Sequence, residues 1–481
     1  MSFLLLQQLF EKIEYTGSLP SAEVQSVEMD SRKVKQGSVF VCTKGLKTDS
    51  HTLAEEALEK GACLIVSERK LGLEKEVTVE NGRKAYALLS AALYDYPAEK
   101  LTLIGITGTN GKSTVASIIK QLLDETGYKA GLIGTMYNQI GEMEIPAKYT
   151  TPEAGDLHAL LARMVQAGCT HAVMEASSQA LAQYRLYGVH FHTGVFTNLS
   201  QDHLDYHKTI DAYFDAKKML FAQCEQAVIN IDDEHGALLA KELTIPLTTF
   251  SQHKDEADYT ARNLELKANG VQFELVGKSF IKRVKLNMPG EYSCQNGMAA
   301  VLAAASTGAD IEELCNALEQ SGNVRGRCEV VFNKNFTVIR DFAHTADALE
   351  NLLSSIAPFK EGRLVVLFGC AGERDATKRP AMGQAVCKYA DYIVLTQDNP
   401  RGEDPYRIFA DVEPVLKQSG KPYVTEINRR KAILDTLNML QDKDTLLLCG
   451  KGHEDYQVLK NQTVYLNEKQ IVQEWAKEKG L

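Results

Sequence analysis

The chain has 481 residues, which is too long for one ordinary hydrophobic core and predicts two to four domains. Its composition, 44% hydrophobic and 24% charged, fits an ordinary soluble protein. The net charge of −10 argues against a general nucleic-acid binder or a binder of anionic membranes, so we expect neither nucleic acid nor membrane among the partners.

The first 15 residues contain a short apolar run that lacks both a basic segment and a small-residue cleavage site. We therefore predict an amphipathic helix there and not a signal peptide. No apolar run is long enough to span a bilayer. Ten cysteines are scattered without a Cys-x-x-Cys pair, which is typical of reduced, buried thiols and not of disulfides or zinc sites. Together these features predict a cytoplasmic protein.

The order of predicted elements indicates an α/β fold of three domains. Residues 1–98 form a small α/β domain, with strands near 38–43 and 62–68 around a helix at 51–62. Residues 99–328 alternate strands and helices, which predicts a parallel sheet, and two antiparallel strands follow within 270–290. Residues 329–481 begin a second alternation and are predicted to be Rossmann-like.

The stretch from Leu101, "LTLIGITGTNGKSTVASIIKQLL", places a glycine-rich turn between an apolar strand and an amphipathic helix. Free backbone N–H groups and a helix N-terminus meet at such a turn and bind anions. Lys112 adds a positive charge, and Ser113 adds a hydroxyl. A plain tight turn is the alternative, but the strand–loop–helix context favours a phosphate loop in an ATPase-like domain. The usual spacing requires a glycine at Ile106, whereas here the glycine is Gly105.

Polar residues follow the next two strands. Glu175 ends one strand, where a carboxylate is able to bind Mg²⁺, although a solvated glutamate or a helix cap is the alternative. Five polar residues then gather within ten positions: Asn198, Asp202, His203, Asp205 and His207. A single histidine is usually structural, but such a dense cluster at a strand end favours a metal or phosphate role.

Two adjacent lysines on the following helix have different surroundings. Lys217 has aromatic and aliphatic neighbours three and four residues away, which places it on the apolar face, whereas Lys218 is better solvated. Burial should lower the pKa of Lys217. The two interpretations are a snorkelling side chain and a neutral amine available for chemistry.

The third domain contains four polar loops, each directly after a predicted strand. They carry Asp341 and His344; Arg374, Asp375, Lys378 and Arg379; Asp398, Asn399 and Arg401; and Lys451, His453 and Glu454. Each loop alone is compatible with an ordinary polar surface. Four loops at strand ends predict a shared cleft rich in guanidinium and carboxylate groups, and arginine is suited to binding carboxylates.

These motifs, taken in order, resemble the Mur ligase family, and within it the MurE type, the UDP-N-acetylmuramoyl-tripeptide synthetases. The resemblance covers the whole chain and rests on "DSRKVKQGSVFV", "GITGTNGKST", "YTTPEA", "EASSQALAQYR", "TNLSQDHLDYH", "YFDAKKMLF", "VRGRCEVV", "DFAHTADALENLL", "GERDATKRPAMG", "DNPR" and "GKGHEDYQ". It also accounts for the displaced glycine of the phosphate loop.

The resemblance implies a reaction in peptidoglycan precursor synthesis, and hence roles in cell-wall biogenesis, cell shape and cell division. ATP phosphorylates the free D-Glu carboxylate of UDP-MurNAc-L-Ala-D-Glu, and a diamino acid attacks the acyl phosphate to give an amide, ADP and phosphate. Mg²⁺ and Lys112 offset the charge on the phosphates. The resemblance implies a UDP-binding first domain, an ATP-binding second domain and an amino-acid-binding third domain, and we expect a monomer.

The resemblance also implies roles for individual residues. The catalytic ones are Lys112, Lys217 and His203. ATP contacts fall on Gly108, Thr109, Asn110, Gly111, Lys112, Ser113, Thr114, Asn296, Arg327, Asp341 and His344. UDP-dipeptide contacts fall on Ser31, Leu46, Lys47, Thr48, Thr150, Thr151, Ser177, Gln183 and Arg185. The amino-acid pocket comprises Arg374, Asp398, Asn399, Pro400, Arg401, Gly450 and Glu454. The Mg²⁺ ligands are Ser113, Glu175, His203 and Lys217, which is modified to a carbamate.

The expected diamino acid is meso-diaminopimelate. Arg401 supplies a fork for its distal carboxylate, Arg374 serves the other carboxylate, and Glu454 takes the distal ammonium. An arginine facing the ammonium of L-lysine repels it, and a buried charge without its partner is strongly unfavourable. The same ligase using L-lysine is the alternative.

The sequence departs from the family pattern at five positions: Ser50, Gln179, Ser293, Phe342 and Ala346 stand where Gly, His, Asn, Tyr and Pro are usual. Two further hypotheses remain, a ligase like folylpolyglutamate synthetase and an inactive nucleotide-binding paralogue. The N-terminal domain and "DNPR" argue against the first. The retained Lys112, Glu175, His203 and Lys217 argue against the second.

Overall fold

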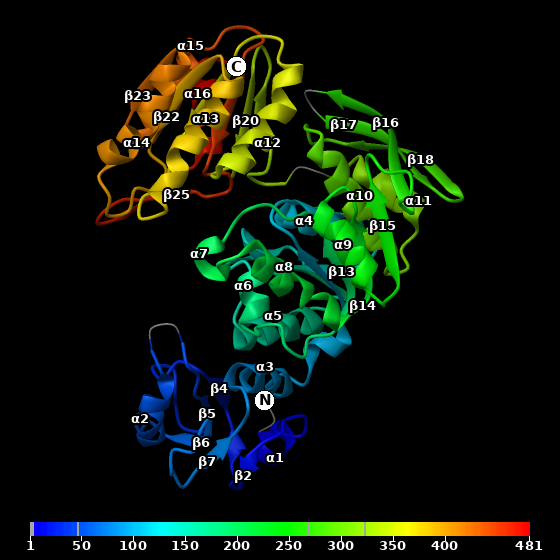
Figure 1. Ribbon diagram of the computed structural model, residues 1–481, viewed down its shortest axis with the longest axis vertical. Coiled ribbons are helices and arrows are strands. Elements are labelled where there is room, and N and C mark those ends of the chain that lie inside the picture. The colour runs from blue at the N-terminus through cyan, green and yellow to red at the C-terminus, as the bar shows by residue number, and fades with distance from the viewer. Residues whose placement is uncertain (1–3, 46–47, 268–269, 322–323) are drawn as a thin grey trace. The chain divides into compact units, whose positions relative to one another are not determined.

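Three α/β regions succeed one another along the chain, as predicted, and each contains its own sheet (Figure 1). The computed structural model describes residues 4–45, 48–267, 270–321 and 324–481. The chain divides into two compact units, residues 1–249 with 302–309, and residues 250–301 with 310–481. The domain boundaries that we placed after residues 98 and 328 stay predictions. Over the described part of the chain, no helix combines the length and the apolar composition needed to cross a membrane.

The N-terminal region of the first unit is a five-stranded sheet with the order β2-β7-β6-β5-β4. Its strands are β2 (Thr16–Gly17), β4 (Ser26–Glu28), β5 (Ser38–Val41), β6 (Ala62–Ser67) and β7 (Glu76–Thr78), and its helices are α2 (Ala54–Glu59) and α3 (Gly82–Leu93). Both predicted strands and the helix between them are confirmed. A short 3₁₀ turn, η1 (Ser50–Leu53), precedes α2, and η2 (Pro97–Lys100) lies in the predicted connector.

The predicted amphipathic helix over the first 15 residues is wrong. Strand β1 (Leu4–Leu5) pairs with β3 (Glu23–Val24), and only one helical turn, α1 (Leu6–Leu9), follows. The backbone N–H of Leu6 donates to the carbonyl of Ala22. This pairing with a neighbouring segment replaces a short helix that is marginal on its own.

The central sheet of the first unit has five adjacent parallel strands, with two antiparallel strands at one edge, in the order β11-β10-β9-β12-β8-β13-β14. The strands are β8 (Thr102–Thr107), β9 (Ala130–Ile133), β10 (Tyr137–Ile140), β11 (Met143–Pro146), β12 (His171–Glu175), β13 (Phe191–Phe196) and β14 (Cys224–Asn230). The helices are α4 (Lys112–Glu125), α5 (Ala154–Gln166), α6 (Ser178–Ala182), α7 (Leu204–His207), α8 (Ile210–Lys218) and α9 (Glu234–Glu242), with the 3₁₀ turn η3 (Phe221–Gln223). The parallel sheet was predicted, whereas the antiparallel extension was not.

The second unit begins with antiparallel strands β16 (Tyr259–Lys267), β17 (Gly270–Gly277) and β18 (Phe280–Leu286), reached through β15 (Leu247–Ser251). The pair β17 and β18 confirms the two predicted antiparallel strands, and β16 adds a third. Helices α10 (Tyr292–Ala305) and α11 (Ile311–Leu318) follow.

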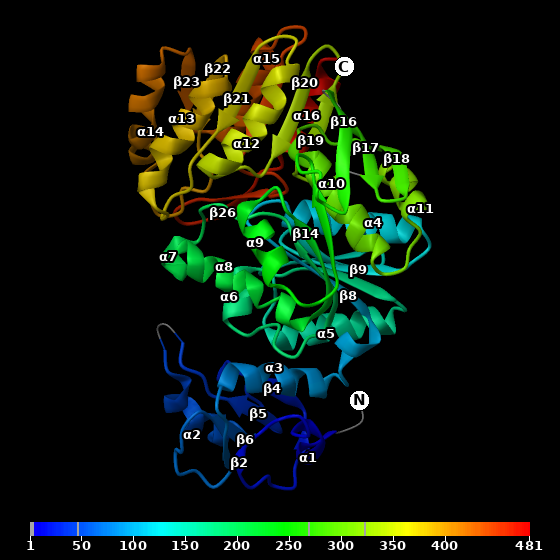
Figure 2. The same ribbon diagram turned by 45° about the vertical axis from the view of Figure 1, so that its right-hand side comes forward.

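The C-terminal sheet has the order β19-β20-β24-β21-β22-β23 and is covered on both faces. Its strands are β19 (Glu329–Asn333), β20 (Thr337–Asp341), β21 (Leu364–Phe368), β22 (Tyr392–Thr396), β23 (Tyr423–Glu426) and β24 (Thr445–Cys449). One face packs on α12 (Ala346–Ile356), α13 (Arg379–Tyr389) and α14 (Pro405–Ser419), and the other on α15 (Arg429–Met439) and α16 (Glu468–Glu478) (Figure 2). The central strands β21, β22 and β24 are therefore apolar on both sides, as in other parallel sheets, whereas the edge strand β19 pairs antiparallel with β20.

Strands β20, β24, β21 and β22 are parallel neighbours, so their carboxyl ends lie along one edge of the sheet. The four polar loops that we predicted at strand ends follow these strands. A small hairpin, β25 (Tyr456–Val458) with β26 (Thr463–Tyr465), comes after the last of them. The 3₁₀ turns η4 (Ala357–Phe359) and η5 (Ala376–Lys378) lie in the connections.

Candidate active site

The phosphate loop lies between β8 and α4, as predicted. Gly108 and Gly111 adopt positive φ angles of 149° and 86°. A Cβ atom on Gly108 would lie 1.9 Å from the Oγ1 of Thr197, so only glycine fits there. Helix α4 begins at Lys112, and its apolar residues are fully buried. The loop therefore presents the N-terminus of a 14-residue helix.

The end of β13 holds this loop in place. The backbone N–H of Asn110 donates to Asn198 Oδ1 over 2.9 Å, and Thr197 Oγ1 donates to the Asn110 carbonyl over 2.7 Å. The backbone N–H of Thr109 donates to the Asn198 carbonyl. Asn198, which the sequence placed in a metal or phosphate cluster, here orders the loop.

The two lysines of the site meet at the loop. Lys112 Nζ donates to the carbonyls of Gly108 and Thr109, at 2.9 and 2.8 Å. Lys217, only 1% exposed, donates to the same Gly108 carbonyl over 2.7 Å, and its Nζ lies 4.2 Å from the ring centre of Tyr213. Burial, assisted by the nearby positive charge of Lys112, holds the pKa of Lys217 well below its usual value.

The predicted difference between the adjacent lysines is confirmed. The side chain of Lys218 is 33% exposed and forms an ion pair with Glu242 over 2.5 Å. This contact raises the pKa of Lys218. Only Lys217 is therefore poised as a neutral amine.

Glu175 is buried at the end of β12 and is held by three hydrogen bonds. Ser113 Oγ donates to Oε2 over 2.9 Å. The N–H of Thr135 donates to Oε1 over 2.7 Å, and its hydroxyl donates to Oε2 over 2.9 Å. A Cβ on Gly134 would lie 2.5 Å from Oε1, so the glycine permits this approach. The sequence analysis missed Thr135, although it follows β9 as the other candidates follow their strands.

The oxygen donors at this point fit Mg²⁺. Ser113 and Glu175 provide a hydroxyl and a carboxylate, and the described residues contain no cluster of three histidine, cysteine, aspartate or glutamate side chains that would form a complete protein cage. Mg²⁺ usually keeps several waters and substrate phosphates and uses only one or two carboxylates. His203 directly precedes α7 and has a positive φ of 53°, and its Nε2 lies 3.6 Å from Asp202 Oδ2.

Four of the predicted UDP-dipeptide residues form one hydrogen-bonded group. Thr151 Oγ1 donates to the Glu175 carbonyl over 2.7 Å and lies 3.1 Å from Ser177 Oγ. Arg185 donates to the Thr151 carbonyl over 2.9 Å and to Gln183 Oε1 over 3.0 Å. The group is thereby linked to the backbone of Glu175, the predicted Mg²⁺ ligand.

The other predicted substrate contacts lie in different parts of the first unit. Thr150 accepts a hydrogen bond from Thr135 over 3.1 Å. Glu153, which the sequence analysis missed, forms an ion pair with Arg185 over 2.8 Å. Ser31 is buried in the N-terminal region, where its carbonyl accepts from Lys60, and Thr48 is exposed. The predicted contacts Leu46 and Lys47 lie outside the described residues.

Two of the predicted ATP-side residues of the second unit, Arg327 and His344, lie against one aromatic ring. Asp341 accepts from the N–H groups of Cys328 and Ala343, and burial raises its pKa, although Arg327 opposes this shift. The Arg327 guanidinium lies 4.8 Å from the Phe342 ring centre, and the His344 ring lies 4.7 Å away. Phe342, one of the departures, is thus the platform for two predicted contacts. Asn296 is buried on α10.

The predicted amino-acid residues assemble at the carboxyl ends of β22 and β24. Asn399 Nδ2 donates to Glu454 Oε2 over 3.1 Å, and Arg401 Nη1 reaches the carbonyls of Gly372 and Asn399. The Val458 N–H of hairpin β25–β26 donates to Asn399 Oδ1, while the Arg401 N–H donates to the Val458 carbonyl. This hairpin fixes the "DNPR" loop, including buried Pro400.

Two other members of the predicted pocket differ in their placement. Gly450 has a positive φ of 107° and faces Asp398: a Cβ would lie 3.6 Å from Asp398 Oδ2. Arg374 is exposed, and among the described residues no hydrogen bond or ion pair joins it to the rest of the group.

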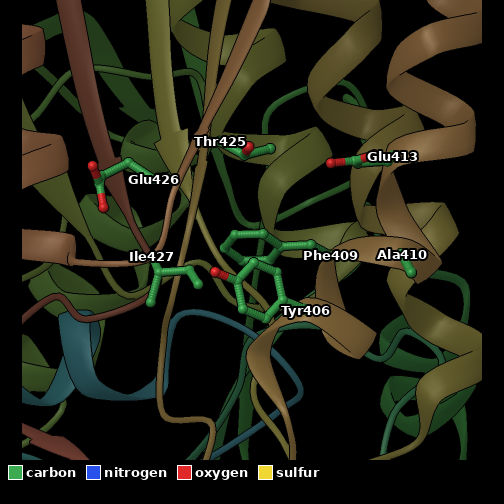
Figure 3. A pocket seen from close by; sticks show the side chains of 7 residues that line it. All are labelled: Tyr406, Phe409, Ala410, Glu413, Thr425, Glu426 and Ile427. Carbon is green, nitrogen blue, oxygen red and sulfur yellow. The ribbon is translucent and has the colours of Figure 1, made fainter.

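A separate cavity of about 470 Å³ lies between α14 and the end of β23. Figure 3 shows that the side chains of Tyr406, Phe409 and Ile427 line the cavity. Both carboxylates of its lining are already paired, Glu413 with Lys417 and Glu426 with Lys431. None of the predicted site residues lines this cavity.

Models of three domains match the chain: "Mur ligase family, catalytic domain" over residues 23–94, "Mur ligase middle domain" over 106–304, and "Mur ligase, glutamate ligase domain" over 326–452.

Individual relatives match nearly the whole chain. A Clostridium acetobutylicum protein named UDP-N-acetylmuramoyl-L-alanyl-D-glutamate–2,6-diaminopimelate ligase 1 is 42% identical over 95% of this chain and 96% of its own. The Clostridium perfringens protein of the same kind is 39% identical over 98% and 99%. A solved structure of such a diaminopimelate ligase is 32% identical, with a TM-score of 0.76 over 100% of both chains.

Proposed function

The chain belongs to the Mur ligase family, and we propose that it is the ATP-dependent ligase that adds meso-diaminopimelate to UDP-MurNAc-L-Ala-D-Glu in peptidoglycan precursor synthesis. We place the reaction in the cytoplasm, where ATP is available, and expect a monomer.

The chemistry proceeds in two steps. The free carboxylate of D-Glu attacks the γ-phosphorus of ATP, which forms an acyl phosphate and releases ADP. An amine of the diamino acid then attacks the acyl carbon; the C–N bond forms, the C–O bond to phosphate breaks, and the amine loses a proton. The acyl phosphate supplies the leaving group that a carboxylate lacks, so the enzyme mainly positions the reactants and stabilises charge.

The phosphate loop supports the first step. The N-terminus of α4 and the Lys112 ammonium provide positive charge where the γ-phosphate of ATP would lie. Ser113 and Glu175 would hold Mg²⁺, which offsets the negative charge of the phosphates when bound. Thr151, Ser177 and Arg185 would orient the UDP-dipeptide, with Arg185 as a cation for one of its acidic groups.

We propose that Lys217 is carbamylated. A neutral amine attacks CO₂, a C–N bond forms, and one proton is lost to water. The burial of Lys217 and the lowered pKa support the neutral amine that this step needs. The product carries a carboxylate in place of the neutral amine beside Lys112, and this carboxylate would serve as a metal ligand. His203 would be a ligand of a second Mg²⁺, separate from the Mg²⁺ that Ser113 and Glu175 would hold.

The observation that carries the amino-acid assignment is the position of Asn399 between two opposite charges. Its backbone carbonyl accepts a hydrogen bond from Arg401, and its side-chain Nδ2 donates to Glu454. The distal centre of meso-diaminopimelate carries both a carboxylate and an ammonium. The Arg401 guanidinium would bind the substrate carboxylate, and the Glu454 carboxylate would bind the substrate ammonium. L-Lysine offers only the ammonium, so Arg401 would be left without a partner. Arg374 would reach the other carboxylate.

A substrate panel tests the proposal. The purified enzyme is given ATP, Mg²⁺ and UDP-MurNAc-L-Ala-D-Glu with meso-diaminopimelate, L-lysine or L-ornithine, and phosphate release is measured. We expect meso-diaminopimelate to have the highest kcat/KM. A higher value for L-lysine would contradict the charge argument. Turnover of folate with glutamate would favour the hypothesis of a ligase like folylpolyglutamate synthetase. No turnover of any substrate would favour the hypothesis of an inactive nucleotide-binding paralogue.

A further inference from the structure

Lys451 lies at the centre of the proposed amino-acid pocket. It follows β24 and is fully buried, with 0% of its surface exposed. Its Nζ donates to Asn399 Oδ1 over 2.9 Å and to the carboxylate of Glu454, and it lies 3.6 Å from Asp398 Oδ1. One ammonium therefore contacts three of the residues that we expect to bind the diamino acid.

The charges of this group do not cancel. Two carboxylates, those of Asp398 and Glu454, surround the single Lys451 ammonium, which leaves one net negative charge. Asp398 Oδ1 is buried and has no hydrogen-bond partner among the described residues. A buried carboxylate oxygen without a donor is unfavourable until a ligand supplies one.

We propose that Lys451 determines the specificity of the pocket by limiting the net charge of the group formed by Lys451, Asp398 and Glu454 to that of one carboxylate; this inference rests on the proposed function. With Lys451 present, the single net negative charge of this group matches the distal ammonium of meso-diaminopimelate. Arg401 then remains available for the distal carboxylate. Without the Lys451 charge, two buried carboxylates repel the distal carboxylate of meso-diaminopimelate and attract a purely cationic end such as that of L-lysine.

Lys451 also compensates buried carboxylates, so its removal alone lowers stability whether or not it sets specificity. A loss of folded protein lowers kcat/KM equally for both amino acids, so a purely structural role leaves the ratio between them unchanged. Lys451 contacts Asp398, Asn399 and Glu454 and acts on the diamino acid through these residues, without touching the reacting amine. It is therefore a positioning residue, and its effect should appear in the choice between substrates.

The test compares the ratio of kcat/KM for meso-diaminopimelate to that for L-lysine in the wild type, Lys451→Met and the double variant Lys451→Met/Asp398→Asn. The ratio does not depend on the fraction of folded enzyme, because both substrates meet the same preparation. We expect it to fall roughly tenfold or more in Lys451→Met. The double variant, which again carries one net negative charge, should regain most of the preference. Lys431→Met removes an exposed lysine of the same unit from its ion pair with Glu426 and is the control.

An unchanged ratio in Lys451→Met, or a lower ratio that Asp398→Asn does not restore, would overturn the inference. If Lys451→Met is inactive with both amino acids, Lys451→Arg decides: a retained preference supports the charge argument, and a lost preference refutes it. A wild type that prefers L-lysine contradicts the proposed function instead, and the direction in which Lys451→Met shifts the ratio still tests the role of Lys451.

Discussion

Lys112 and Lys217 donate hydrogen bonds to the same acceptor, the carbonyl oxygen of Gly108, over 2.9 Å and 2.7 Å. They come from α4 and α8, more than 100 residues apart in the chain. Two ammonium groups on one carbonyl repel each other, and the more buried one loses its proton first. Lys112 is partly exposed, whereas Lys217 is buried, so the site divides into a phosphate-binding cation and a neutral amine.

We predict that Lys217→Ala lowers kcat by more than about a hundredfold, because it removes the carbamate that would bind the metal. Short carboxylates added to the assay should restore part of the activity. Lys218→Ala is the matched control and should be mild, since Lys218 is solvated and paired with Glu242. An essential Lys218, or an unmodified Lys217 amine in a well-resolved crystal structure, would refute the assignment.

We predict that Thr135→Val raises the Mg²⁺ concentration for half-maximal activity by about 10- to 100-fold, because the Glu175 carboxylate loses the hydroxyl that orients it. The backbone hydrogen bond from Thr135 remains in this variant. Thr126→Val removes a hydroxyl that only caps the end of α4 and serves as the control. An unchanged Mg²⁺ titration curve for Thr135→Val would show that Glu175 needs no such support.

We predict that Arg401→Ala reduces the preference for meso-diaminopimelate over L-lysine by about tenfold or more, since a charge-assisted hydrogen bond is worth ~1.5–3 kcal/mol. Most of the loss should appear as a higher KM for meso-diaminopimelate. Arg430→Ala removes an exposed arginine that pairs with Glu474 in the same unit and should leave the preference intact. Equal preferences in the wild type and Arg401→Ala would exclude Arg401 from specificity.

We predict that His158 on α5 makes the protein less stable in acid. The side chain is buried, neither ring nitrogen has a hydrogen-bond partner among the described residues, and burial lowers its pKa to about 4. His158 is therefore protonated below about pH 6.5 in the unfolded chain, but only below about pH 4 in the folded chain. The full stability is present above pH 6.5, and about 2 kcal/mol should be lost by pH 5.

The measurement for His158 is urea unfolding followed by circular dichroism at pH 7.5 and pH 5.0. His158→Met should lose less stability than the wild type between these values. His190→Gln, which changes an exposed histidine, should behave as the wild type does. The same pH dependence in His158→Met and the wild type would rule out this role.

Features that depend on local pattern could be predicted from the amino-acid sequence alone. The strand–glycine–helix order predicted the phosphate loop, because the backbone freedom of glycine and the start of a helix are encoded within a few residues. Helical spacing separated buried Lys217 from solvated Lys218. Apolar runs followed by polar residues predicted that Asp341, Asp398 and Glu454 follow parallel strands whose carboxyl ends share one edge.

Contacts between side chains that lie far apart in the chain became visible only in the folded protein. Thr135 holds Glu175 from 40 residues away, and Lys451 contacts Asn399 from 52 residues away. Strand β1 replaced the predicted N-terminal helix because its partner, β3, lies elsewhere in the chain. Such contacts depend on how whole helices and strands pack, because a buried polar group forms hydrogen bonds with the donors and acceptors that the fold places near it. The local periodicity of the sequence carries no information about these distant partners.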